Sequence, residues 1–145
     1  MNDSAVRPLP VAPTILLLED NDAYRALITE FLTLAGFEVV AAPDGRRVPE
    51  LLQQLQVDLL ITDLSMPERE GIETMTDLRY SHPRLPVIAI SGDVPLNTHL
   101  YLTLAEKLGA SRVLAKPFKM EQLVLAAREA IAASNSGAGN TRPAG

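Results

Sequence analysis

Polar residues that could do chemistry stand directly after four short apolar runs of the sequence. They comprise three carboxylates, one hydroxyl and one ammonium: Glu19, Asp20, Asp63, Ser91 and Lys116. Carboxylates packed together raise each other's pKa and destabilise a fold unless they share a cation. A hard divalent ion such as Mg²⁺ takes oxygen ligands of this kind, together with waters and a phosphate. The set therefore predicts a site for a metal ion and an anionic ligand.

The same residue types suit phosphoryl transfer to a carboxylate. An aspartate that attacks phosphorus forms an aspartyl phosphate, and the reaction needs positioning and charge neutralisation, which Mg²⁺ and Lys116 would supply. Taken singly, each residue has a plainer interpretation: Asp20 as a helix cap, Asp63 and Ser91 as turn residues, and Lys116 as a solvated side chain. The hypothesis therefore depends on the set and on a fold that brings its members together.

Five buried strands are predicted to position these residues. Apolar runs rich in Val, Ile and Leu, with little polar alternation, are typical of parallel strands covered on both faces. The runs are Thr14–Leu18, Glu38–Ala42, Leu59–Thr62, Val87–Ile90 and Val113–Ala115. In a doubly wound sheet, ligands bind beyond the carboxyl ends of the strands. Each candidate site residue follows such an end.

Amphipathic segments after each strand predict five helices. They cover residues 24–35, a stretch from Pro49 through Leu55, and residues 72–80, 100–108 and 120–131. Asp22 is predicted to cap the first helix, with Asp20 and Asn21 as alternatives, and Gly36 to stop it. Strands that alternate with helices give right-handed parallel crossovers. The predicted fold is therefore α/β: a doubly wound, flavodoxin-like sheet of five parallel strands in the order 2-1-3-4-5.

Length and composition narrow the function further. The 145 residues allow one domain, expected over 14–133, between flexible segments at 1–13 and 134–145. The sequence contains no cysteine, which excludes disulfides, zinc knuckles and thiol nucleophiles. A formal net charge of −5 argues against nucleic-acid binding. No apolar run is long enough to span a membrane, and no secretory signal is visible, so a cytoplasmic location is expected.

These motifs, in this order, resemble the receiver domain of bacterial two-component response regulators. The resemblance covers about residues 14–133. The matching stretches are Leu16–Asn21, Asp58–Pro67 with Gly71, Val87–Gly92 and Ala115–Phe118. The resemblance implies a domain that accepts a phosphoryl group in a Mg²⁺-dependent reaction and that signals rather than acts as an enzyme.

The resemblance assigns the acceptor and the metal ligands by position. Asp63 resembles the phosphoacceptor, and Asp20 looks like the direct Mg²⁺ ligand. Glu19 would assist through water or by orienting Lys116. The backbone carbonyl of Ser65 would complete the protein's share of the metal shell.

The resemblance also assigns a switch. Ser91 is similar to the hydroxyl that turns toward the phosphoryl group. Lys116 would pair with a phosphoryl oxygen, and a cis peptide bond before Pro117 would aim it inward. The family often carries an aromatic residue where this sequence has Val113, and a β-branched valine cannot make the aromatic swing. We therefore expect the fourth predicted helix and its flanking loops to carry the output.

The partners follow from the same resemblance. The phosphoryl donor would be a sensor histidine kinase or a histidine phosphotransfer protein. The chain offers no room for an output module, which predicts a stand-alone receiver that binds a downstream target protein or passes the phosphoryl group on. A monomer or a weak homodimer is expected.

Three alternatives compete with this interpretation. A haloacid-dehalogenase-type phosphatase would use the Asp-x-Asp of Asp20 and Asp22, but it leaves the Asp63 motif without a role, and the Thr that usually follows is absent. A phosphorylation-independent pseudo-receiver would bind partners without chemistry, and Val113 leaves room for it. A flavin protein of the same fold is disfavoured because the acidic residues after the first strand would repel a phosphate.

Overall fold

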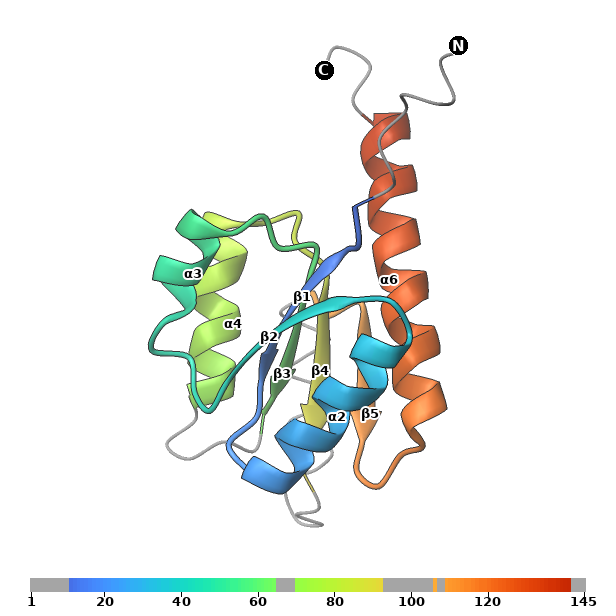
Figure 1. Cartoon of the computed structure of the whole chain (residues 1–145). Helices are drawn as coiled ribbons and strands as arrows, with labels where there is room; N and C mark the ends of the chain where they lie inside the picture. Colours follow the sequence, from blue (N-terminus) through green and yellow to red (C-terminus); the bar gives the residue numbers. More distant parts are fainter. Residues whose placement is uncertain (1–10, 65–69, 93–105, 107–108, 142–145) are drawn as a thin grey trace, which may run out of the picture.

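A parallel sheet of five strands with helices on both faces forms the fold (Figure 1). The computed structural model describes residues 11–64, 70–92, 106 and 109–141. The strands lie in the order β2-β1-β3-β4-β5, and every neighbouring pair is parallel. They are β1 Thr14–Leu18, β2 Glu38–Ala42, β3 Leu59–Asp63, β4 Val87–Ser91 and β5 Arg112–Ala115. The predicted fold class and strand order are confirmed.

Four helices of the described residues connect and cover these strands. They are α2 Asp22–Leu34, α3 Val48–Gln54, α4 Glu70–Ser81 and α6 Met120–Thr141. A proline in the first turn of α3 fits the predicted start of that helix. The helix predicted over residues 100–108 falls, apart from Glu106, outside the described residues, as does the N-terminal stretch 1–10. Gly109, predicted to end that helix, has a φ of 85°, a conformation that favours glycine.

Two helix boundaries differ from the predictions. The side chain of Asn21, rather than that of Asp22, caps α2 by accepting a hydrogen bond from the Tyr24 backbone N–H at 2.8 Å. Helix α6 continues to Thr141, so residues 134–141, expected to form part of a flexible tail, are helical. Alanine has the highest helix propensity, and the sequence has three alanines and no proline between Ile131 and Pro143. The polar composition of this stretch therefore does not end the helix.

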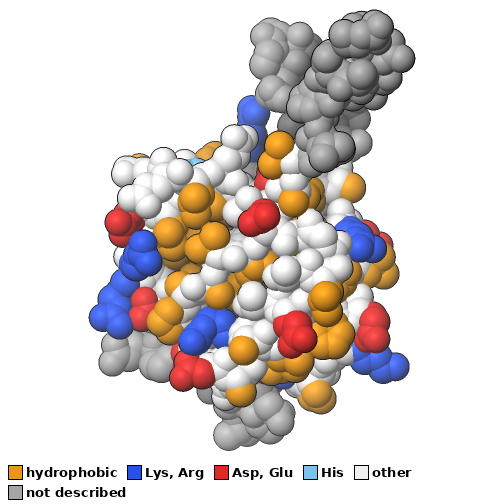
Figure 2. Space-filling view, viewed as in Figure 1, with side chains coloured by type: hydrophobic (Ala, Val, Ile, Leu, Met, Phe, Trp, Pro, Cys, Tyr) orange, Lys and Arg blue, Asp and Glu red, His pale blue; other side chains and the backbone are white. Residues whose placement is uncertain are grey.

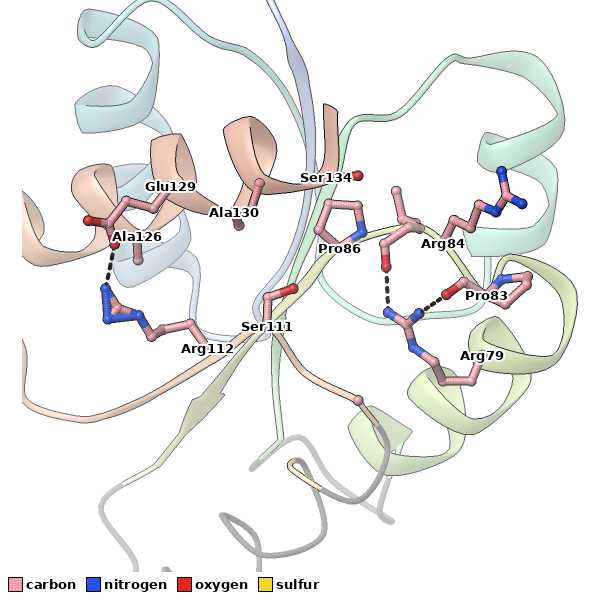
Figure 3. A pocket seen from close by; sticks show the side chains of 13 residues that line it. Arg79, Pro83, Arg84, Pro86, Ser111, Arg112, Ala126, Glu129, Ala130 and Ser134 are labelled. Carbon is pink, nitrogen blue, oxygen red and sulfur yellow. Dashed lines mark hydrogen bonds and ion pairs between the residues drawn. The ribbon is translucent and has the colours of Figure 1, made fainter. Parts of the chain in front are cut away.

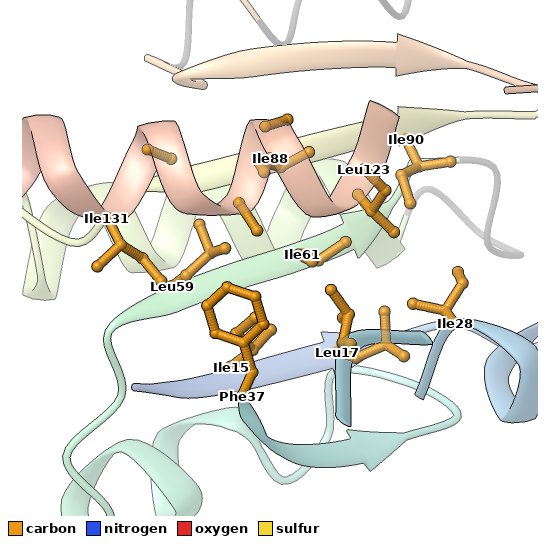
Figure 4. Packing of buried hydrophobic residues seen from close by; sticks show 14 residues of the cluster. Ile15, Leu17, Ile28, Phe37, Leu59, Ile61, Ile88, Ile90, Leu123 and Ile131 are labelled. Carbon is orange, nitrogen blue, oxygen red and sulfur yellow. The ribbon is translucent and has the colours of Figure 1, made fainter. Parts of the chain in front are cut away.

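The strands carry a hydrophobic core on each face of the sheet. Leu17 and Ile61 belong to a cluster that includes residues of α2 and α6 (Figure 4). Their strand neighbours Leu16 and Leu60 belong to a second cluster, which includes residues of α3 and α4. Each buried aliphatic side chain stabilises the fold by about 1.5–3 kcal/mol. Because β1, β3 and β4 are held from both sides, the residues at their carboxyl ends stand on a rigid support.

Within the described part of the chain, no helix is both long and apolar enough to cross a bilayer.

Candidate functional site

The candidate site lies at the carboxyl edge of the sheet, where β1, β3, β4 and β5 end. The strand register pairs Leu18 with Thr62, so Glu19 and Asp63 emerge at one level, and it pairs Ser91 with Ala115, so Lys116 emerges directly beyond the end of β4. Asp63 itself is the last residue of β3 and pairs with Ile90. The sheet thereby brings together residues that lie far apart in the sequence.

Lys116 is the centre of the site. Its Nζ donates hydrogen bonds to Asp63 Oδ2 at 3.0 Å and to Glu19 Oε1 at 3.2 Å. The side chains of Asp63 and Glu19 are only 2% and 1% exposed, whereas that of Lys116 is 21% exposed. Buried carboxylates need such a partner, because an uncompensated charge away from water is costly. The predicted convergence of these three residues is borne out by the geometry.

Asp20 completes an acidic cluster with Glu19 and Asp63. One carboxylate oxygen from each residue lies within 4.8 Å of the others, and Asp20 is the exposed member of the three. This donor set fits Mg²⁺, a hard cation that takes one or two carboxylates and keeps several waters. The exposure of Asp20 leaves room for those waters. The carbonyl of Ser65, predicted as a further ligand, lies outside the described residues.

The charges of the site perturb one another. Burial raises the pKa of Glu19 to about 7; the nearby charge of Asp63 adds to the rise, and a hydrogen bond from the Asn21 backbone opposes it. Burial alone would lower the pKa of Lys116, but its hydrogen bond and charge interaction with Asp63, followed by those with Glu19, raise it. The carboxylates therefore repel each other and share the ammonium as their cation.

The loop between β1 and α2 is held by local hydrogen bonds. Asn21 donates its backbone N–H to Glu19 Oε2 at 3.0 Å. Arg25 donates through Nη1 to the backbone carbonyl of Glu19 at 2.8 Å and through Nη2 to Asp22 at 2.7 Å. These bonds fix the backbone on both sides of Asp20. Arg25 was not among the predicted site residues, although its place one turn into α2 sets it against this loop.

The predicted switch residues are placed in part. Ser91 is fully buried at the end of β4; its hydroxyl donates to the Gly92 carbonyl at 3.4 Å, and its own carbonyl accepts from the Lys116 backbone N–H at 2.9 Å. The peptide bond between Lys116 and Pro117 is cis, as the family resemblance implies. Val113 pairs with Ala89 and packs against the second core cluster. Most of the helix expected to carry the output lies outside the described residues.

Sequence reasoning also missed the contact of Tyr24 with Lys116. The ring centroid of Tyr24 lies 4.4 Å from Lys116 Nζ. The same ring meets Phe118 edge to face, with centroids 6.0 Å apart. The hydrophobic pattern placed Tyr24 on the core face of α2, and it does pack against the first core cluster. The signal that could have found it is an aromatic residue in the first turn of a helix that follows an acidic loop.

A separate cavity of about 500 Å³ lies at the amino edge of the sheet, between α4, α6 and the starts of β4 and β5 (Figure 3). The Arg79 guanidinium donates to the backbone carbonyls of Pro83 and Leu85, and Arg112 pairs with Glu129 at 2.7 Å. These two arginines are thus bonded within the protein, and the carboxylates predicted to hold a metal lie at the other edge.

Comparisons with known proteins agree with this geometry. The family model described as "Response regulator receiver domain" matches residues 15–128. The chain is 34% identical over 117 residues to the regulatory protein VirG of Agrobacterium tumefaciens (strain 15955), covering 81% of this chain and 43% of VirG. It is 37% identical over 110 residues to the transcriptional regulatory protein CpxR of Escherichia coli (strain K12), covering 76% of this chain and 45% of CpxR.

A solved structure shares the fold. The receiver domain protein (CheY-like) of Methanospirillum hungatei JF-1 superimposes with a TM-score of 0.77 at 20% identity, covering 87% of this chain and 98% of that one. The chain spans less than half the length of VirG and CpxR. The predicted resemblance is confirmed by the family model: this chain belongs to the response regulator receiver domain family.

Proposed function

We propose that this domain accepts a phosphoryl group on Asp63 in a Mg²⁺-dependent reaction and signals through protein–protein contacts or a phosphorelay. The observation that carries the proposal is the ammonium of Lys116, bonded at once to Asp63 and Glu19 beside a third carboxylate, Asp20. The donor would be a histidine kinase or a histidine phosphotransfer protein of the cytoplasm.

The transfer makes one bond and breaks one bond at phosphorus. A carboxylate oxygen of Asp63 attacks the phosphorus of a phosphohistidine, and the P–N bond breaks. The imidazole nitrogen keeps the electron pair and takes up a proton from solvent, while Asp63 becomes an acyl phosphate. Later attack by water on phosphorus releases inorganic phosphate and restores the carboxylate. The protein signals between these two steps.

The residues of the site divide the work of charge neutralisation. Asp20 and Asp63 would hold Mg²⁺ directly, and Glu19 would support it through water. When bound, the metal supplies positive charge to the oxygens of the transferring group. Lys116 would exchange part of its contact with Asp63 for a phosphoryl oxygen. Ser91 would donate its hydroxyl to another oxygen after its side chain rotates away from Gly92.

Intact mass after incubation with acetyl phosphate tests the proposal. Wild type is expected to gain one phosphoryl adduct with Mg²⁺ and none with EDTA. Asp63→Asn is expected to lose the adduct because it removes the attacking oxygen's charge. Asp20→Asn is expected to need a higher Mg²⁺ concentration. Asp77→Asn, a change of the same kind at an exposed position on α4, is the matched control.

Two outcomes would overturn this function. An adduct that survives Asp63→Asn but requires Asp20 would favour the phosphatase alternative. No adduct on wild type, either from acetyl phosphate or from a panel of autophosphorylated histidine kinases, would favour a pseudo-receiver.

The helix beside the site offers a surface for the phosphodonor protein. Leu27, Phe31 and Leu34 repeat at helical spacing on α2 and are exposed, Leu34 at 78%; apolar side chains gather on this side of the molecule in Figure 2. A hollow of about 280 Å³, lined in part by Leu27, Tyr24 and Lys116, joins the surface to the site. A helical domain that presents a phosphohistidine to Asp63 would rest on this stripe.

Charge placed on the stripe tests this docking. Leu34→Asp is expected to slow phosphoryl transfer from a histidine kinase at least tenfold and to leave transfer from acetyl phosphate within twofold of wild type. Tyr80→Asp, at a 94% exposed position on α4, is the control. Equal slowing with both donors would show damage to the site instead of lost docking.

A further inference from the structure

The ring of Tyr24 contacts the ammonium group on which the proposed chemistry depends. Lys116 Nζ lies 4.4 Å from the ring centroid, within the roughly 6 Å range of a cation–π contact. The same ammonium lies 3.0 Å from Asp63 Oδ2 and 3.2 Å from Glu19 Oε1. Three groups therefore hold Nζ, and one of them, the ring, is uncharged.

The ring is itself held in place. Phe118, two residues after Lys116, meets it edge to face at 6.0 Å with an interplanar angle of 72°. The backbone N–H of Tyr24 is bonded to the cap residue Asn21 at 2.8 Å. Tyr24 and Phe118 also pack against the first core cluster. The aromatic face thus presents a fixed surface on which the lysine can rest.

A fixed uncharged contact matters most while the charges change. Lysine has a long flexible stem, and its ammonium is a compact charge with rotatable donors. When Asp63 becomes an acyl phosphate, its carboxylate charge is lost and the negative charge lies on the phosphoryl oxygens, so Nζ has to exchange part of its contact with Asp63 for a phosphoryl oxygen. The ring keeps the same attraction throughout, because it depends on the ring quadrupole. Tyr24 can therefore restrain the ammonium while Nζ exchanges one oxygen partner for another.

Resting on the proposed function, we propose that Tyr24 is a positioning residue that keeps the Lys116 ammonium directed at the phosphoacceptor. It acts through Lys116 and takes no part in bond making. The aromatic group stands on α2 and packs against the first core cluster, on the face of the sheet opposite the second cluster, against which Val113 packs. This chain would thus stabilise its lysine from the β1–α2 side of the sheet.

Rates of phosphoryl uptake from acetyl phosphate test the positioning. Tyr24→Leu is expected to slow uptake three- to tenfold, the size of a partly exposed cation–π contact. Tyr24→Phe keeps the ring and is expected to stay within twofold of wild type. Mg²⁺ affinity, titrated with the metal alone, is expected to stay within twofold in both variants. Tyr80→Leu, which removes an exposed tyrosine from α4, is the matched control.

A second set of measurements separates positioning from structural damage. In a Lys116→Met background, Tyr24→Leu is expected to have no further effect on uptake, because the group it positions is absent. Ring-current shifts of the Lys116 ε-methylene protons are expected in wild type and Tyr24→Phe and to vanish in Tyr24→Leu. These shifts are read without phosphoryl transfer, so they test the contact even if wild type forms no adduct.

The proposal is overturned by any of three results. Uptake by Tyr24→Leu at the wild-type rate would show that the ring is dispensable. Equal slowing in Tyr24→Phe and Tyr24→Leu would assign the effect to the hydroxyl. The same slowing in the Lys116→Met background would show that Tyr24 acts independently of the lysine.

Discussion

At the carboxyl edge of the sheet, Lys116 bonds to two buried carboxylates, whereas at the amino edge Arg79 bonds to two backbone carbonyls. Both cations are partly buried. Lys116 joins residues that are 97 and 53 positions away in the sequence, whereas Arg79 bonds to the loop that directly follows its own helix. Their partners differ in one respect: carboxylates can gain a proton, a metal or a phosphoryl group, and peptide carbonyls cannot. A cation held by carboxylates can therefore exchange partners during a reaction, and a cation held by carbonyls serves to hold a loop.

The largest expected effect separates the two cations by function. Lys116→Met is expected to reduce the rate of phosphoryl uptake about a hundredfold, the size typical of removing one preorganised charge-stabilising group. Arg79→Met is expected to leave uptake per folded molecule within twofold. Intact-mass time courses with acetyl phosphate and Mg²⁺ measure both. Similar losses of uptake rate in the two variants would show that the cations at the two edges of the sheet do not differ in function.

The next largest effect distinguishes Arg79 from Lys116 by its contribution to the stability of the fold. Arg79→Met leaves the carbonyls of Pro83 and Leu85 without their donor, which is expected to cost about 1–3 kcal/mol of unfolding free energy. Urea denaturation measures this loss. Arg84→Met, an exposed arginine of the same loop, is the control and is expected to change stability by less than about 0.5 kcal/mol. If Arg79→Met left the unfolding free energy unchanged, water would have replaced the guanidinium as the donor to these carbonyls.

The pH dependence of stability sharpens the contrast. The pKa of Glu19 is raised in the folded protein to about 7 from an ordinary value of 4.5, mainly by burial. The folded state thus binds this proton more tightly than the unfolded state, so the stability it contributes is present below pH 4.5 and is lost as pH rises through 7. Urea denaturation without Mg²⁺, between pH 5 and 8, is expected to show this decline. Glu19→Gln is expected to remove most of this decline in stability with pH, whereas Arg79→Met is expected to leave the decline unchanged.

The smallest effect concerns the backbone beside Arg79. Gly109 has a φ of 85°, and a Cβ there would meet the Arg79 side chain at an ordinary contact distance of 3.7 Å. Gly109→Ala is therefore expected to cost about 1–2 kcal/mol through backbone conformation alone. Gly36→Ala, with a φ of 104° and open space around the added carbon, should cost the same. A larger loss at Gly109, seen in thermal denaturation, would mean that Arg79 cannot move aside.

Much of the fold could be predicted because its signals are local. The five strands begin within one residue of their predicted starts, since runs such as Leu59–Ile61 are apolar on both faces and end in a polar residue. The helix ends were harder to predict. Asp20, Asn21 and Asp22 can all cap a helix, and backbone geometry selects Asn21. The tail after Ile131 has a composition that suits either a helix or a loop.

The site could be predicted as a set of residues, and only partly as a set of contacts. Glu19, Asp63 and Lys116 were found because each follows a strand, and parallel strands end at the same edge. The contacts of Tyr24 and Arg25 were not found, because both lie on a helix whose rotation about its axis decides what they touch. Hydrophobic spacing shows which face of α2 packs on the sheet, but it does not give the exact rotation of the helix about its axis. The distance from Tyr24 to Lys116 depends on that rotation.

The site is assembled from residues that lie far apart along the chain. The hydrogen bond from Lys116 to Glu19 joins residues 97 positions apart, and the one to Asp63 joins residues 53 apart. Contacts of such separation form late in folding, because closing a long loop costs entropy before it is rewarded. If β1 and β3 pair before β5 joins the sheet, the carboxylates come together before their lysine arrives. Competence to accept a phosphoryl group would then coincide with the last step of folding.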